Sequence, residues 1–312
     1  MFALRGIAVS LTFFVLLYSI LSLLVGGAWR GVRFLRGLSP GSLANVLFSL
    51  RILPLVSSAA VTVALVVPAY VRLEPRSIDE DIALPLVLAL GCLLVFAVGI
   101  FRVIAAQTRT ARVVAEWLRG ANAIDAGVTA PTFRTGRQTP PLTLVGVCSP
   151  RVVVSETTVA LLNHDELRVA VQHEVAHIRS HDNLKKLVMY CAPFPGMAGL
   201  ETAWHEAAEL AADDGAVASV PEALDLAAAL IKLSRLLPVA GTLNFTMALV
   251  GERGSVSSRV ARLLAWSDAE AHHTPTRWTY AVPSILALIL CAAALYEPVL
   301  TQTHKISEWL VR

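Results

Sequence analysis

Four long stretches of the sequence contain no charged residue and consist mostly of apolar side chains. They cover residues 7–25, 52–71, 82–101 and 278–296. A transmembrane helix needs about 20 apolar residues in a row to cross the hydrocarbon core of a bilayer. Hydrophobic residues make up 55% of the chain and charged residues only 16%, which excludes an ordinary soluble domain. The sequence therefore predicts four transmembrane helices, of which the first three form a membrane domain over residues 1–101.

A cleavable signal peptide is the alternative interpretation of the first stretch. Its apolar core is longer than that of a signal peptide, and no small-residue cleavage site follows it. Four prolines are expected near the ends of the predicted spans, where a missing backbone donor is tolerated: Pro54, Pro68, Pro85 and Pro283. We therefore interpret all four stretches as helices that cross the bilayer.

Positive charge is distributed unevenly between the loops. The loop after the first span contains four arginines and no acidic residue: Arg30, Arg33, Arg36 and Arg51. The next loop contains the mostly acidic sequence EPRSIDED at 74–81. Because lysine and arginine near span ends stay on the cytoplasmic side, both termini are predicted to lie outside. Residues 102–277 then form a cytoplasmic domain, and residues 297–312 form a short extracytoplasmic tail.

The predicted cytoplasmic domain mixes strands and helices. Two short β-forming runs, 142–147 and 152–154, are separated by a turn and predict a hairpin. Asn163 and Glu166 have the spacing of a capping box at the start of a helix. Helices are predicted at three places: 164–181, 199–219 and 222–237. The chain as a whole is expected to be mainly α, with an α+β domain between the third and fourth spans.

Residues 187–200, LVMYCAPFPGMAGL, join the first two of these helices. The segment has no charge, is too short to cross a bilayer and is interrupted by Pro193 and Pro195. Two interpretations stay open: a connector buried inside the protein, or a loop that rests on the membrane face close to the site described next.

His173, Glu174 and His177 have the spacing of a zinc site on a helix. Residues four apart share one face of a helix, so both imidazoles can reach one ion while Glu174 holds a water molecule beside them. A catalytic zinc keeps three protein ligands and one open position. A third ligand must therefore come from another part of the chain.

Glu209, in the sequence ELAAD, is the best candidate for this third ligand. Asp213 follows one turn later, where it can accept a hydrogen bond from a ligating imidazole. His205 and Glu206 are the substitutes for Glu209. The alternative is that the acidic residues of this helix only form a solvated face: Glu206, Glu209, Asp213 and Asp214.

Other residues with suitable chemistry fit less well. His181 is expected at a helix end on the surface, and Asp182 is expected to cap a helix or form a salt bridge. No basic run with interleaved aromatics occurs, so no nucleic acid partner is predicted. Four cysteines without CxxC spacing predict neither a disulfide framework nor a cysteine zinc site: Cys92, Cys148, Cys191 and Cys291.

The sequence SPRVVVSETTVALLNHDELRVAVQHEVAHIRSHDNLKKL, followed by PFP and ELAADD, resembles the M56 membrane metallopeptidases, the group of the BlaR-type antirepressor proteins. The likeness covers about residues 150–215. It implies a bacterial protein of the cytoplasmic membrane whose zinc peptidase domain, of the gluzincin type, lies in the cytoplasm. The M48 membrane proteases share the ligand pattern and are the nearest alternative family.

The resemblance also implies roles for individual residues. Glu174 would be the catalytic base, and Asp213 the partner of a ligating imidazole. Two features depart from the family: Ala212 stands where many members have cysteine, and only 16 residues follow Tyr296, so no extracellular sensor domain is expected. Three residues would bind one zinc ion: His173, His177 and Glu209.

These features predict a zinc-dependent endopeptidase that cuts a protein substrate. The main interpretation is a regulatory protease that removes a transcriptional repressor; the alternatives are a quality-control protease for membrane proteins and a catalytically silent scaffold. Glu174 would take a proton from the zinc-activated water and pass it to the leaving amine. The strand before Ser155 is expected to pair with the substrate backbone. The oxyanion-stabilising group stays open among Arg259, Arg262 and His205.

Overall fold

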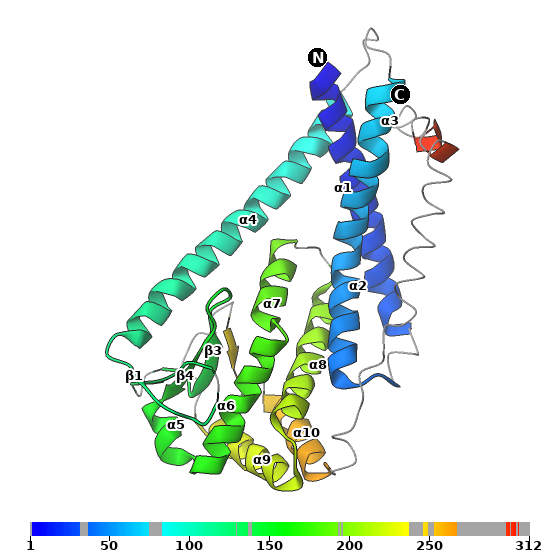
Figure 1. Cartoon of the computed structure of the whole chain (residues 1–312). Helices are drawn as coiled ribbons and strands as arrows, with labels where there is room; N and C mark the ends of the chain where they lie inside the picture. The colour runs from blue at the N-terminus through cyan, green and yellow to red at the C-terminus, as the bar shows by residue number, and fades with distance from the viewer. Residues whose placement is uncertain are drawn as a thin grey trace.

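The computed structural model shows a mainly helical protein, with long helices at one end and a small sheet surrounded by shorter helices at the other (Figure 1). This confirms the predicted mixture of long helices and a smaller α+β part. The predicted fourth span at 278–296 lies outside the described residues. The structure describes these ranges: 2–31, 37–74, 83–128, 130–136, 139–192, 194, 196–236, 246–248, 253–266, 298–299, 301–303 and 305.

Within this part of the chain, three helical segments have the length and composition to cross a membrane. They are α1 (Phe2–Ala28) with the 3₁₀ turn η1 (Trp29–Gly31), α2 (Pro40–Val61) continuing through the π turn η3 (Thr62–Val66) into α3 (Val67–Leu73), and α4 (Ala83–Leu118). A helix is thus confirmed at each of the first three predicted spans. Two of the helices are longer than the predicted spans: α2 begins before residue 52, and α4 continues past residue 101 beyond the apolar stretch.

Exposed apolar side chains mark a band of similar length on all three segments. The band runs from Leu4 to Leu24 on α1, from Leu53 to Leu73 on α2 and α3, and from Leu84 to Ile104 on α4. Each range covers twenty residue steps, which is about 30 Å at the rise of an α-helix. This is the thickness of the hydrocarbon core of a bilayer. The apolar band is therefore the surface that lipid would cover, and the protein is a membrane protein.

Two prolines interrupt the second segment in different ways. Pro54 lies inside α2, which begins at Pro40, but it is next to Leu53, where the apolar band begins, so its expected place near the end of the span agrees with this band. Pro68 lies in the first turn of α3, directly after η3. Proline lacks a backbone N–H and displaces the carbonyl one turn earlier. A π turn is one of the local adjustments by which a helix accommodates such a disruption.

The predicted hairpin is present inside a five-stranded sheet. Strands β3 (Leu142–Val145) and β4 (Arg151–Ser155) pair antiparallel, as predicted. Gly146 opens the turn with a φ of 92°, and a Cβ there would lie 2.7 Å from the carbonyl oxygen of Ser149, so only glycine fits. The other strands were not predicted: β1 (Asn122–Ala123), β2 (Thr132–Thr135) and β5 (Thr246–Ala248). The strand order is β1-β2-β4-β3-β5.

The three predicted helices of this domain are confirmed as α6 (His164–Arg179), α8 (Ala198–Ala216) and α9 (Val220–Ser234). The start of α6 has the predicted capping box. The backbone N–H of Glu166 donates to Asn163 Oδ1 at 2.8 Å, and the backbone N–H of Asn163 donates to Glu166 Oε2 at 2.9 Å. The described residues of this part form three further helices: α5 (Glu156–Leu161), α7 (Asp182–Cys191) and α10 (Arg253–Leu264).

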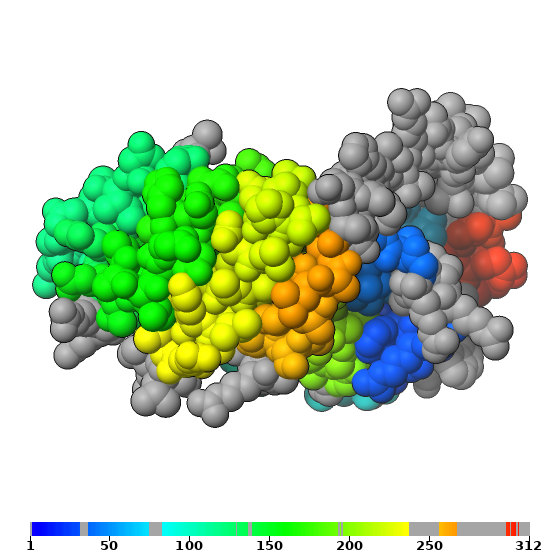
Figure 2. Space-filling model, turned by 90° about the horizontal axis from the view of Figure 1, so that it is seen from below, coloured from blue at the N-terminus to red at the C-terminus, as the bar shows by residue number. Residues whose placement is uncertain are grey.

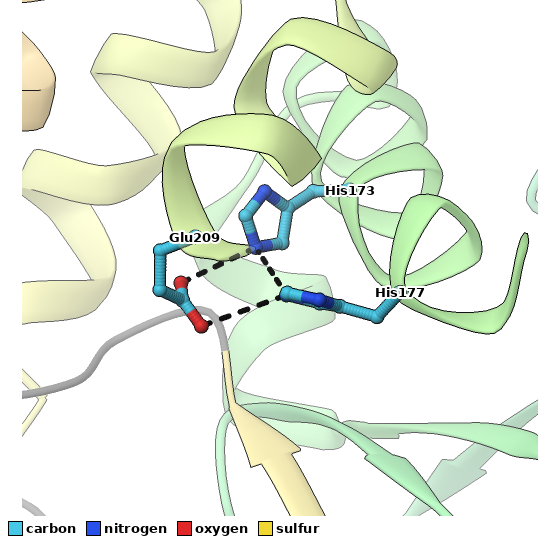
Figure 3. A group of neighbouring side chains, drawn as sticks. All are labelled: His173, His177 and Glu209. Carbon is cyan, nitrogen blue, oxygen red and sulfur yellow. Dashed lines mark hydrogen bonds and ion pairs between the residues drawn. The ribbon is translucent and has the colours of Figure 1, made fainter. Parts of the chain in front are cut away.

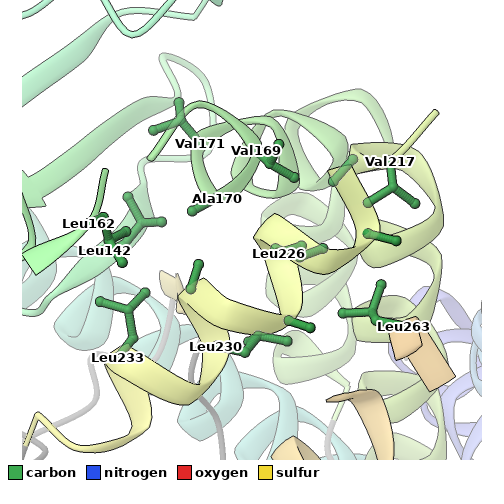
Figure 4. Close-up of a cluster of buried hydrophobic side chains, with 14 of the residues drawn as sticks. Leu142, Leu162, Val169, Ala170, Val171, Val217, Leu226, Leu230, Leu233 and Leu263 are labelled. Carbon is green, nitrogen blue, oxygen red and sulfur yellow. The ribbon is translucent and has the colours of Figure 1, made fainter. Parts of the chain in front are cut away.

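A hydrophobic core holds the sheet, α6, α9 and α10 together (Figure 4). Leu142 of β3, Val169 of α6 and Leu230 of α9 are almost completely buried in it. Burial of one such side chain contributes about 1.5–3 kcal/mol, so α6 is held firmly against the sheet and α9. Seen from below, α9 and α10 lie between the green α5 and α6 and the blue ends of α1 and α2 (Figure 2).

Several residues of the connector at 187–200 are buried against the membrane helices, as the first of the two earlier interpretations expected. Its first part belongs to α7, and Met189, Met197 and Leu200 share a second hydrophobic core with Leu47 of α2. The ring of Phe194 meets the ring of Tyr18 of α1 edge-on, with centroids 5.5 Å apart. The connector therefore attaches the metal-motif half of the protein to α1 and α2.

Candidate metal centre

Helices α6 and α8 bring three metal-binding side chains together. His173 and His177 project from one face of α6, and Glu209 projects towards them from α8 (Figure 3). One ligand atom from each residue lies within 4.8 Å of the other two, and all three residues are buried. The Nε2 atoms of the histidines are 3.2 Å apart, and Glu209 Oε1 lies 3.5 Å from His177 Nε2. These atoms converge on one point, as the ligands of a single metal ion do.

The two oxygens of Glu209 differ in their surroundings. Oε2 accepts a hydrogen bond from Arg259 Nη1 at 2.8 Å. Oε1 is buried and has no hydrogen-bond partner within the described part of the chain. A buried polar atom without a partner costs about 1–3 kcal/mol. A divalent cation bound by both histidines would satisfy it, so the three residues could hold a metal ion.

Carboxylates lie beside the other ring nitrogens of both histidines. His173 Nδ1 is 3.0 Å from Asp213 Oδ1, at the place predicted for Asp213. His177 Nδ1 is 2.7 Å from Asp182 Oδ2. Such carboxylates fix the tautomer and orientation of a ligating imidazole. The expectation that Asp182 lies at a helix end and forms a salt bridge is confirmed, and the pair that it forms with His177 is part of the candidate centre. The sequence signal for this contact is the position of Asp182 at the start of α7, the helix that follows the motif helix.

Arg259 of a neighbouring helix donates hydrogen bonds to two carboxylates of α8. It lies on α10 and donates to Asp213 Oδ2 from Nε at 2.8 Å and to Asp213 Oδ1 from Nη2 at 2.6 Å, besides its bond to Glu209. Arg262, one turn later, pairs with Asp214 at 2.6 Å. Both guanidinium groups thus contact carboxylates, which argues against the open option that either stabilises an oxyanion. The sequence did not predict this role of Arg259, because Arg259 is 46 residues from Asp213 and 50 residues from Glu209, and no motif covers such a separation.

Burial and neighbouring charges shift the pKa values of the candidate ligands Glu209 and His173. Burial alone would raise the pKa of Glu209, but His173, His177 and Arg259 outweigh it and hold the pKa below the usual range. Burial would lower the pKa of His173, but the carboxylates of Asp213 and Glu209 raise it to about 9. The carboxylates are therefore charged at neutral pH, as metal binding requires.

Glu174 lies beside the two histidines and is completely buried. Neither oxygen of its carboxylate makes a hydrogen bond of normal geometry within the described residues, although the backbone of Leu144 lies near enough to lower its pKa. Burial raises the pKa of Glu174 to about 7, although both histidines act to lower it. A carboxyl group with a pKa near neutrality is suited to accept and release protons during a reaction.

The raised pKa of Glu174 predicts that the free energy of unfolding of the metal-free protein depends on pH. Between pH values of about 4.5 and 7, the unfolded chain loses this proton while the folded chain keeps it, so stability falls as pH rises. Above about pH 7 the full cost, about 3 kcal/mol, is present. Metal-free Glu174→Gln should therefore unfold at a higher temperature than metal-free wild type near pH 8, and at a similar temperature near pH 4. Equal differences at both pH values would contradict this.

The remaining candidates occupy the periphery of the centre. His205 is partly buried one turn before Glu209, and burial lowers its pKa. Glu206 is exposed, and so is His181, which adopts a left-handed conformation between α6 and α7. The interpretation of α8 as one solvated acidic face is wrong, because Glu209 and Asp213 are buried. Cysteines at three positions are free: Cys92, Cys148 and Cys191.

The sheet edge next to the centre differs from the expectation. The strand before Ser155 is β4, which lies between β2 and β3 and has no free edge, so its predicted pairing with substrate is wrong. Strand β3 is nearer to the centre, since Leu144 and His177 line one cavity of about 170 Å³. Thr246–Ala248 pair with the other edge of β3. A substrate strand on β3 would have to displace them.

Comparison with known proteins identifies the family. The model of peptidase family M48 matches residues 144–304, which are 161 of the 312 residues. No curated protein and no solved structure matches the chain. The resemblance to M56 is therefore wrong, and M48, the nearest alternative, is the family that matches. The two families were confused because both share the ligand spacing of the motif residues on α6 and α8. With its matched segment beginning in β3 and containing the three candidate ligand residues, the chain belongs to peptidase family M48, a family of metallopeptidases.

Proposed function

We propose that the protein is a zinc-dependent endopeptidase of the membrane that acts in the turnover of proteins there. The observation that carries the proposal is the convergence of two imidazoles and one carboxylate beside the unpaired carboxylate of Glu174. The repressor-cleaving interpretation depended on the likeness to BlaR-type proteins, and the M48 match favours turnover instead. A silent scaffold would have no use for a buried ligand set with two supporting aspartates. The arginines of the loop after α1 support a position of this centre on the cytoplasmic side.

Each residue of the centre has a distinct role in this proposal. His173, His177 and Glu209 hold the zinc ion, which when bound supplies a Lewis acid for the scissile carbonyl and activates water. Glu174 accepts the proton of the attacking water and delivers it to the nitrogen of the leaving amine. Asp213 and Asp182 hold the two imidazoles in the ligating tautomer, and Arg259 keeps Glu209 Oε1 turned towards the histidines.

The proposal predicts that zinc content depends on Glu209. Wild type purified in detergent should contain about one zinc ion per chain and cleave casein, and a chelator should abolish cleavage until zinc is returned. Glu209→Ala should reduce zinc content and cleavage by about tenfold or more, because loss of a ligand weakens the site directly. Elemental analysis and a protease assay measure both.

Glu206→Ala is the matched control, since Glu206 lies on the same helix and is exposed. This variant should keep both zinc and cleavage. Full zinc occupancy in Glu209→Ala would show that another residue is the third ligand. Wild type that binds zinc but cleaves neither casein nor peptides would refute the proposed activity.

A further inference from the structure

The apolar band sets the level at which the membrane ends on the side of the metal centre. On α1 the band ends at Leu24, and on α2 it begins at Leu53. Arg51 lies just outside it and is completely buried, with Nε donating to Glu201 Oε1 at 2.8 Å and Nη2 donating to the Ala192 carbonyl at 2.6 Å. The membrane boundary is therefore at the level of the connector and the start of α8.

Helix α8 runs antiparallel to α2 in a fixed register. Arg51 meets Glu201, and a Cβ on Gly41 would lie 4.0 Å from Ala211 Cβ. The ten-residue step from Arg51 to Gly41 on α2 thus runs beside the ten-residue step from Glu201 to Ala211 on α8. Glu209 is eight residues beyond Glu201, about 12 Å further from the membrane. The two residues from Arg51 to Leu53 add about 3 Å, so the metal centre lies about 15 Å from the membrane boundary.

This distance is held by rigid packing. Arg51 is buried together with the backbone carbonyls that it contacts, and Tyr18 Oη also donates to the Ala192 carbonyl at 3.2 Å. Lys185 of α7 donates to Asn45 of α2 at 3.0 Å. The core around Leu47 joins α2, α7 and α8. The metal centre therefore cannot move towards or away from the membrane without breaking this packing.

Two cavities meet at the β3–β4 turn, where Gly146 lines both. A cavity of about 290 Å³ begins at Gln107 of α4, three residues beyond the end of the apolar band at Ile104, and extends to Gly146 of the β3–β4 turn. The cavity of about 170 Å³ is lined by Gly146 and by His177. Gln107 Oε1 is buried without a hydrogen-bond partner within the described residues. It is an acceptor available to the backbone N–H of an extended peptide.

We propose, on the basis of the proposed function, that the enzyme cuts membrane-anchored proteins at a fixed short distance from their membrane-spanning segment. An extended chain rises about 3.3 Å per residue, so about five residues cover the 15 Å from the boundary to the metal centre. A path along α4 and the β3–β4 turn is longer than a straight line. The cut therefore lies about five to ten residues from the end of the substrate's span.

Single-span model proteins with a repetitive tail test this distance. The tail consists of one short unstructured unit repeated many times, so that every position offers the same local sequence. Enzyme and substrate are reconstituted together in vesicles, and the new ends are mapped by mass spectrometry. We expect cuts concentrated about five to ten residues from the span. The same tail on a soluble carrier should be cut along its whole length.

The outcomes separate this inference from the proposed function. Cuts spread evenly along the anchored tail, with the soluble tail also cut, would overturn the fixed distance and leave the peptidase activity standing. No cut in either tail would overturn the proposed function and the inference with it.

A second variant tests the path itself. Ala111 of α4 is exposed and lines the larger cavity, so Ala111→Trp should fill part of it without disturbing the fold. We expect cleavage of the anchored tail to slow by about tenfold while zinc content stays unchanged. Ala105→Trp is the control, because Ala105 is exposed on the same helix outside that cavity. Equal rates for the two variants would overturn the path along α4.

Discussion

Glu174→Gln is expected to lower kcat for peptide hydrolysis by about 10³-fold without loss of zinc. Glutamine has nearly the same shape as glutamate but cannot accept the proton of the attacking water, and removal of a positioned base costs about 10²–10⁴-fold in rate. Glu174 is not among the three converging ligand residues, so metal binding should persist. Initial rates on a fluorogenic peptide and zinc analysis of the same sample measure the two effects.

The substitution has an unusual advantage as a test. Most changes at buried charged residues weaken a fold, whereas this one removes a carboxylate whose burial already raises its pKa to about 7. Loss of activity with an unchanged or higher unfolding temperature then reports chemistry and not unfolding. Glu206→Gln, on the exposed side of α8, should retain wild-type rates. Hydrolysis by Glu174→Gln at more than about a tenth of the wild-type rate would remove Glu174 from the role of base.

The parts of the site that the sequence predicted are those encoded within one helix or its neighbour. His173, Glu174 and His177 share a single helix whose capping box and apolar face are local signals. Glu209 and Asp213 were found because a following helix is the expected source of a third ligand. A short motif of this kind defines the chemistry but is shared between families, which is why it indicated M56 where the match is to M48.

The parts that sequence reasoning missed depend on contacts between distant residues. Arg51 was interpreted as a loop arginine, because hydropathy locates the apolar band and not the helix around it. In the structure α2 extends beyond that band to pack against α8, and Arg51 is inside the extension. Strand β5 pairs with β3 from about a hundred residues away. Such long-range pairing leaves no periodic signal in either segment.

Arg259→Met is expected to destabilise the metal domain far more than Arg262→Met. Both arginines lie on α10 and pair with neighbouring aspartates of α8, so the two variants are closely matched. Arg259 is 2% exposed, and its loss leaves the buried carboxylates of Glu209 and Asp213 without their guanidinium partner. Breaking a buried ion pair from one side costs about 3–5 kcal/mol. The Arg262 pair is partly exposed, where such pairs contribute about 0–1 kcal/mol.

Thermal unfolding in detergent, followed by near-ultraviolet circular dichroism, measures the difference. The metal-free Arg259→Met protein should unfold about 10 °C below metal-free wild type, and Arg262→Met within about 3 °C of it. Zinc should reduce the deficit of Arg259→Met, because a bound cation neutralises part of the charge that Arg259 leaves uncompensated on Glu209. Equal effects of the two substitutions would mean that Arg259 does not stabilise the ligand carboxylate. A deficit that zinc leaves unchanged would mean that Arg259 and the metal ion act on separate parts of the centre.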